Sequence, residues 1–291
     1  MNRIIHNAVV VDANMLARRH EATLGSALGD ACRAGRQIFV PRALIFETIQ
    51  EGSWEETLRK DFRVVAEFRD YTFLEKLSSE LMGIERLAGW VAPSLVDEVK
   101  TEWFRSLLSE VLSGTVGPVF AGIRRRPLDI EQYTEKTRAD LLEQKQGHLL
   151  FVEHFKKQVP RESLADAAGS RSEYRKLLAE RSVVSLCREH LLQSGYSHDL
   201  ATHLAILPSW TSNFFYTLAG YALHYATRQG LDSRSPRKVA SDFADLLHVR
   251  LALSCAQFLT EDKRAYALWE DLCAVIDDRC ARMTSLLNAP V

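Results

Sequence analysis

The sequence predicts an α/β protein, with a parallel-sheet core that is split by a large all-helical insertion. Three observations predict it. Short β-branched apolar runs closed by polar residues occur near both ends of the chain, which is typical of buried strands. Segments with helical spacing follow these runs, and strand–helix alternation opens a parallel sheet. The long stretch between the two ends shows helical periodicity only.

The first 50 residues predict two strand–helix pairs. Residues 8–11, Ala-Val-Val-Val, form a short apolar run that predicts a buried strand ending at Asp12. A helix follows and stops at a glycine. Residues 37–40 predict a second strand, which a proline ends. Residues 44–49 then have helical spacing, which places Glu47 on the less apolar side of that helix.

From about Trp54 to Gly230 we find only helical periodicity, divided into several helices by glycine and proline. The most apolar stretch, residues 205–226, contains Pro208 and several polar residues. A membrane span needs about 20 predominantly apolar residues, so this stretch indicates a buried helix and no membrane association. We therefore expect three segments: residues 1–55 as the first part of the core, 56–234 as the helical insertion and 235–291 as the second part.

The α/β character returns in the last segment. Ser235-Pro236 opens a helix that runs to about Ser254, with proline in the tolerated first turn. Residues 256–260 then predict a strand, which ends in Glu261-Asp262. A final amphipathic helix has its apolar positions at Leu268, Leu272, Val275 and Ile276.

Composition sets broad limits on function. Lys plus Arg (37) nearly equals Asp plus Glu (38), so net charge neither indicates nor excludes a nucleic-acid partner, which needs only a local basic face. The five cysteines include no CxxC pair, and each falls in an apolar stretch read as helix. They predict buried thiols in a reducing compartment. With no signal-peptide pattern at the N-terminus, we expect a cytoplasmic protein.

Acidic residues follow the expected strands. Asp12 ends the first strand, Asp262 follows the last, and Glu47 lies on the helix after the second. Asp242 and Asp245, three residues apart, share one face of a helix. Ligands of open α/β sheets bind beyond the carboxyl ends of strands. Converging carboxylates repel unless a cation neutralises them, so the pattern predicts a divalent cation such as Mg²⁺, and two such ions can activate water against a phosphodiester.

Four ordered segments resemble the motifs of the PIN-domain family: Val-Val-Val-Asp12-Ala-Asn14, Pro41-Arg-Ala-Leu-Ile-Phe-Glu47, Asp242-Phe-Ala-Asp245-Leu-Leu-His248 and Phe-Leu-Thr260-Glu-Asp262-Lys263. The resemblance covers the two ends of the chain and leaves the helical middle unexplained. It implies a parallel-sheet α/β/α core, an acidic pocket that binds Mg²⁺ or Mn²⁺, and usually ribonuclease activity.

The resemblance also implies roles for single residues. Thr260 would help to orient the attacking water, and Asn14 could support Asp12 by a hydrogen bond. Asp242 competes with Asp245 for the third position. The implied metal ligands are Asp12, Glu47, Asp245 and Asp262.

The same residues also have interpretations in which they serve only the structure. Each acid alone could end a strand, face solvent, complement a helix dipole or, for Asp262, cap a helix. His248 lies one turn beyond Asp245 and could contact the site, although a core histidine is more common. The aromatic run from Trp210 to Tyr225 favours hydrophobic core over base stacking. Three basic residues near the third motif could steer phosphates of a nucleic acid, expected to be RNA: Arg234, Arg237 and Lys238.

Competing functions can be compared on the same residues. A haloacid-dehalogenase-like phosphatase needs a second Asp where Asn14 stands, and no phosphate-binding GxxxxGK[ST] loop occurs. The main alternative is a non-catalytic PIN-like scaffold that binds RNA or protein through its insertion. The resemblance is also compatible with a homodimer and with an inhibitory protein partner. From the expected repulsion among acids, Asp12→Asn should keep the fold and could raise the melting temperature without metal.

Overall fold

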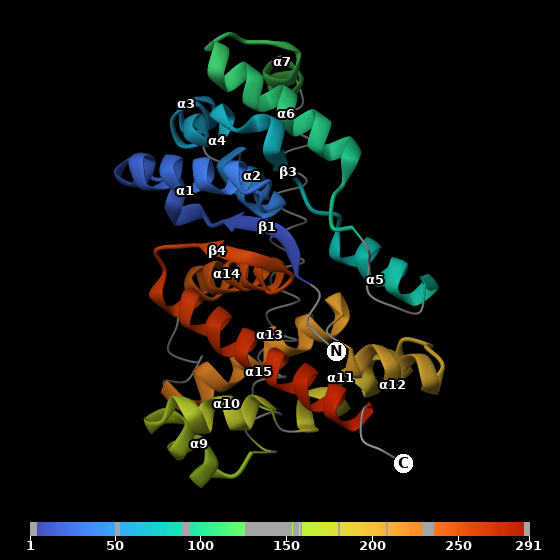
Figure 1. Cartoon of the computed structure of the whole chain (residues 1–291). Coiled ribbons are helices and arrows are strands. Elements are labelled where there is room, and N and C mark those ends of the chain that lie inside the picture. Colours follow the sequence, from blue (N-terminus) through green and yellow to red (C-terminus); the bar gives the residue numbers. More distant parts are fainter. Residues whose placement is uncertain are drawn as a thin grey trace.

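Four parallel strands lie between two groups of helices in the computed structural model of the chain (Figure 1). The structure describes residues 5–49, 53–88, 94–125, 153, 157, 159–179, 181–207, 209–228 and 236–287. A parallel sheet with helices on both faces is an α/β arrangement, and most of the described residues are helical.

The sheet is small, and its strand order is β3-β2-β1-β4. Its strands are β1 (His6–Val11), β2 (Gln37–Phe39), β3 (Thr72–Phe73) and β4 (Cys255–Leu259). β1 pairs with β2 on one side and with β4 on the other, with Val10 opposite Phe39 and Phe258. The chain therefore proceeds from β1 toward β3 in one direction, and β4 joins the other edge of β1. This reversal is the topological switch point, beyond which ligands of α/β sheets bind.

Side chains of β1 and β2 alternate between two hydrophobic cores. Val10 and Phe39 point to one face of the sheet, whereas Val11 and Ile38 point to the other. Strands covered on both faces need apolar residues at successive positions, and residues 8–11 are all fully buried. Burial of each such side chain contributes roughly 1.5–3 kcal/mol to the free energy of unfolding.

One core, the first-face core, lies under helices from the first half of the chain. These are α1 (Glu21–Arg33), α2 (Arg42–Ile49), α3 (Trp54–Asp61), α4 (Arg63–Glu67), α6 (Glu98–Ser113) and α7 (Pro118–Arg125). α1 ends as predicted, at Gly35, whose φ is +64°. A short helix, η1 (Ala13–Leu16), joins β1 to this layer.

The second-face core is larger and is built mostly from the second half of the chain. Its helices are α5 (Ser78–Ala88), α9 (Arg161–Gly169), α10 (Arg171–Ala179), α11 (Arg181–Gln193), α12 (His198–Ile206), α13 (Trp210–Arg228), α14 (Pro236–Leu253) and α15 (Lys263–Leu287). In Figure 1, α14 and α15 lie on the side of β4 opposite α1 and α6. The predicted first-turn proline of α14 and the buried positions Leu272, Val275 and Ile276 of α15 are confirmed.

The expectation of helices alone between residues 54 and 230 is wrong at one place. β3 pairs in parallel with β2, with Ile38 opposite Thr72. A strand of two residues is too short to show a period of two in the sequence, which explains why the pattern passed over it. The segment that the sequence placed in the helical insertion thus contributes a strand to the sheet, and α3, α4, α6 and α7 to its first-face core.

Two further predictions concern the five cysteines and the aromatic run. No disulfide joins any of the five cysteines, all of which the structure describes, but Cys255 begins a strand and not a helix. Trp210, Tyr216, Tyr221 and Tyr225 are buried in the second-face core, as predicted for the aromatic run.

In the part of the chain that the structure describes, no single helix is long and apolar enough to cross a membrane. Only α6 and α7 taken as a pair, bent by 105°, meet the criteria of length and composition. Both helices pack in the first-face core.

Candidate metal centre

Asp12 is the buried end of the central strand. Its backbone N–H donates to the carbonyl of Leu259 at 3.0 Å, so the β1–β4 pairing continues to this residue. Only 2% of its surface is exposed. Asp12 is also the N-cap of η1, because its carboxylate accepts from the N–H of Ala13. The sequence places an acid here because a short polar side chain both ends a strand and caps a turn.

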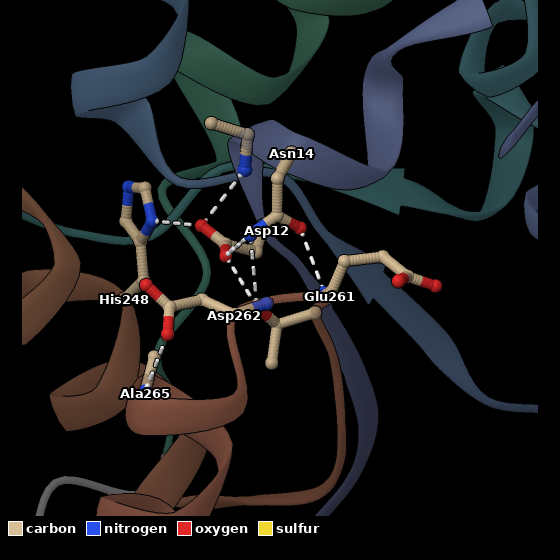
Figure 2. Close-up of polar contacts among 8 residues, drawn as sticks. Asp12, Asn14, His248, Glu261, Asp262 and Ala265 are labelled. Atoms are coloured by element: carbon tan, nitrogen blue, oxygen red, sulfur yellow. Dashed lines mark hydrogen bonds and ion pairs between the residues drawn. The ribbon is translucent and has the colours of Figure 1, made fainter. Parts of the chain in front are cut away.

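Four donors surround the carboxylate of Asp12 (Figure 2). Its Oδ1 accepts from Ala13 N at 2.8 Å and contacts His248 Nδ1 at 2.7 Å. Its Oδ2 accepts from Asn14 Nδ2 at 2.8 Å and from Thr260 Oγ1 at 2.6 Å. An ionised carboxylate offers about four lone-pair positions, and all four have a partner here. The predicted support of Asp12 by Asn14 is confirmed.

These contacts set the charge of the buried acid. Burial alone would raise the pKa of Asp12, but the hydrogen bond and charge of His248 and the hydrogen bonds from Thr260 and Ala13 outweigh it, so the pKa lies below its ordinary value. Asp12 is therefore ionised near neutral pH. Its negative charge is compensated by fixed donors from η1, α14 and the segment after β4.

Thr260 ties the ends of β1 and β4 together. Its hydroxyl donates to Asp12, and its oxygen accepts from Asn14 Nδ2 at 3.1 Å and from Asp262 N at 3.0 Å. Asn14 completes the bridge, since its Oδ1 accepts from Glu261 N at 2.9 Å. In the structure Thr260 thus holds Asp12 in place. Its expected role in orienting a water stays a prediction.

Asp262 caps the last helix. Its Oδ1 accepts from Arg264 N at 2.7 Å and from Ala265 N at 3.2 Å, which satisfies the first turn of α15 (Figure 2). The helix-cap interpretation of this acid is therefore correct. Asp262 nevertheless lines the same small cavity as Asp245, so capping leaves it beside the acidic centre.

Three side chains converge closely enough to bind one cation. Ligand atoms of Asp12, Asp245 and His248 lie within 4.8 Å of one another. Asp245 and His248 are three residues apart on α14 and share a face, while Asp12 comes from β1. With ligand bonds of about 2.1 Å, two ligands on opposite sides of an ion are about 4.2 Å apart, so a small side-chain adjustment would close the group. A buried group of two Asp and one His could hold a metal ion.

The side chains of five other expected site residues lie outside what the structure describes. The backbone places Glu47 on α2, and Asp242, Arg237 and Lys238 on α14, but their side chains lie outside the described set. Arg234 lies outside the described residues altogether. The structure thus brings together Asp12 and Asp245 with His248, with Asp262 next to them across a cavity.

Glu75 is an acid at this edge of the sheet that the sequence did not indicate. It follows β3, and its carboxylate accepts from the N–H of Arg42, at the start of α2, at 3.0 and 3.1 Å. Burial raises the pKa of Glu75 to about 7, against the opposing effects of the Arg42 N–H and the charges of Arg42 and His248. The signal was missed because β3 itself was missed.

A cavity of about 60 Å³ adjoins the acidic centre. Asp245 and Asp262 line it together with Arg264 and two tyrosines of α13, Tyr221 and Tyr225. A buried water needs roughly 10–15 Å³ of such space, so the cavity has room for several waters beside the carboxylates.

Comparisons with the models of known protein families, with curated proteins and with solved structures give no match.

The four donors around Asp12 reverse the sequence-based expectation for Asp12→Asn. In the variant, the side-chain amide nitrogen would replace one carboxylate oxygen and would face two hydrogen-bond donors at either position. Asn14 cannot rotate its own side-chain amide to compensate, because its Oδ1 would then lose the hydrogen bond from Glu261 N. We expect the free energy of unfolding of the variant, measured with urea in the presence of EDTA, to be lower than that of the wild type by about 2–4 kcal/mol. The exposed pair variant Asp30→Asn is the matched control. A melting temperature equal to or above that of the wild type would contradict this assignment.

Glu75 is expected to make stability depend on pH. A carboxyl group whose pKa is raised on folding stabilises the protein fully below its unfolded value, near 4.5, and this stability is lost as pH rises through about 7. From pH 5 to pH 8, the free energy of unfolding of Glu75→Gln should therefore rise relative to that of the wild type by about 2–3 kcal/mol. Urea unfolding at the two pH values measures it, with the exposed Glu80→Gln as control. Parallel stability curves for wild type and Glu75→Gln would exclude the effect.

Proposed function

We propose that the chain is a metal-dependent nuclease that hydrolyses phosphodiester bonds, with RNA as its expected substrate. The observation that carries the proposal is the convergence of Asp12, Asp245 and His248 within 4.8 Å at the carboxyl end of the central strand. This is the switch point of the sheet, where ligands of α/β proteins bind. The four-motif resemblance of the sequence supports the same function.

The ligand set favours Mn²⁺ over Mg²⁺. Carboxylates suit both ions, but an imidazole nitrogen is a better ligand for transition metals. His248 is only 1% exposed and comes from the same helix face as Asp245, so its ring is held against the carboxylates by packing. When bound, the ion would lower the pKa of a coordinated water and stabilise the charge that develops on the phosphate.

The chain's own residues would have distinct tasks. Asp12 and Asp245 would hold the ion with His248. Asn14 and Thr260 fix the orientation of the Asp12 carboxylate through bonds of 2.8 and 2.6 Å. Such supporting contacts tune affinity because they determine which lone pairs remain for an ion. For Asp12 to coordinate, one of its four donors must yield, and the His248 contact is the one that an ion between the two residues would replace.

One observation favours a second function, the non-catalytic scaffold. Asp12 is fully hydrogen-bonded without any cation, so it can serve as a structural anchor between β1, β4 and α14. In that case the protein would bind RNA or a protein partner and cut nothing. Cleavage assays separate the two functions directly.

The test compares cleavage of end-labelled single-stranded RNA and DNA with Mn²⁺, Mg²⁺ or EDTA. Asp245→Asn is the informative variant, because Asp245 makes none of the four bonds that hold Asp12. We expect cutting that requires metal and falls about 100-fold or more in this variant. The exposed Asp199→Asn, on α12, should cut like the wild type. A folded wild type that cuts neither substrate with either ion would leave the scaffold as the function.

A further inference from the structure

A second cavity, larger than the first, opens beside the acidic centre. It measures about 480 Å³ and lies between the corner that joins α9 to α10, one side of α13 and the first turns of α15. Sites for small molecules usually measure about 300–1,000 Å³. The smaller cavity, at about 60 Å³, suits a few waters, whereas this one has the size of a nucleotide-binding site.

The two cavities adjoin. His224, Arg264 and Leu268 line both of them. Asp245 and Asp262 line only the smaller one, so a chain that occupied the large cavity could reach the acidic centre across Arg264. In Figure 1, α10 lies alongside α15. Residues of α10, α13 and α15 line the large cavity.

The lining of the large cavity is positively charged. Its cations are Arg171, which is paired with Glu270 outside the lining, together with Lys263 and Arg264, and it includes only one acid, Asp271. That acid is 6% exposed and accepts from Arg171 Nε at 2.6 Å and from Arg175 Nε at 2.6 Å, so its charge is compensated. Lys263 and Arg264 are exposed, and Arg264 also lines the small cavity, where its Nε lies 3.9 Å from the carboxylate of Asp262. An anion would be attracted there.

The rest of the lining fits a nucleoside. Tyr174 and His224 present rings, and the hydroxyl of Tyr174 donates to the carbonyl of Gly220 at 2.9 Å, which fixes its ring orientation. Ser170 and Thr227 contribute hydroxyl groups to the same wall. Rings for stacking and cations for the backbone are the two features that bind single strands without sequence preference.

We propose that this cavity is a subsite for one nucleotide of a single-stranded nucleic acid, with a backbone phosphate held by Lys263 and Arg264. The nucleotide is the neighbour of the phosphodiester at the acidic centre. The assignment rests on the proposed function for its place next to the cleaved bond. Binding of the strand itself needs no metal and can be measured without cleavage.

The test is fluorescence anisotropy of a labelled oligouridylate in EDTA, over a range of salt concentrations. The variant Lys263→Ala/Arg264→Ala removes two exposed cations. We expect about tenfold weaker binding, with a logarithmic salt slope smaller by about 0.7, as for one lost phosphate contact on a single strand. The control Lys60→Ala/Lys100→Ala removes the same charge from α3 and α6, over the opposite face of the sheet, and should bind like the wild type.

A second variant tests the cavity without changing charge. Ala267→Trp fills the large cavity and should weaken oligouridylate binding while leaving the salt slope and the Mn²⁺ affinity, measured by calorimetry, unchanged. Wild-type affinity and salt slope in Lys263→Ala/Arg264→Ala would overturn the subsite. Uridine monophosphate that binds as tightly as the oligouridylate would also overturn it, in favour of a free-nucleotide site. If the oligouridylate binds as expected but no bond is cut with metal, the proposed nuclease fails and the subsite stands.

Discussion

The buried carboxylate of Asp12 is the constraint on which the rest of the site depends. A charge that is 2% exposed is costly unless it is paired and hydrogen-bonded, and four donors from three parts of the chain meet this requirement. They come from η1, from the segment after β4 and from α14. Fixing one carboxylate therefore fixes how the two ends of the chain meet.

The same constraint explains the position of His248 and Asp245. His248 reaches Asp12 because α14 packs against β1 and β4 and leads directly into β4, which pairs with β1. Asp245, one turn earlier on α14, is brought to the centre by the same packing. The acidic centre is thus a consequence of strand order, and it combines a structural role for Asp12 with a ligand set that suits a divalent cation.

The sequence predicted the parts of the fold that carry strong local signals. The two buried strands of the first 50 residues, β4 and the helices that flank them are marked by short apolar runs and by glycine or proline at their ends. β3 was missed because two residues carry no periodicity, and with it Glu75 and the packing of α6 against the sheet.

Contacts within the site were harder to foresee. The sequence indicated Asp12 from its place at a strand end and Asp245 from the helix face it shares with Asp242, and the resemblance implied Asn14 as a support for Asp12. Nothing in the sequence shows that Asp12 has four donors. That fact depends on Thr260 and His248, which lie 248 and 236 residues away along the chain. His248 was considered as a core residue, and it is both buried and in contact with the acid. Asp262 was expected as a metal ligand. In the structure its Oδ1 accepts hydrogen bonds from Arg264 N and Ala265 N, which is the helix-cap role that the local sequence also indicated.

We propose above all that Asp12, Asp245 and His248 together bind a divalent cation. Anomalous diffraction from crystals grown with Mn²⁺ tests this most directly, because the signal locates the ion without reference to activity. We expect one strong peak within coordination distance, about 2.0–2.3 Å, of both carboxylates and of a ring nitrogen of His248, with the Asp12–His248 hydrogen bond replaced. Crystals that retain this 2.7 Å contact and show no peak between the three residues would contradict it.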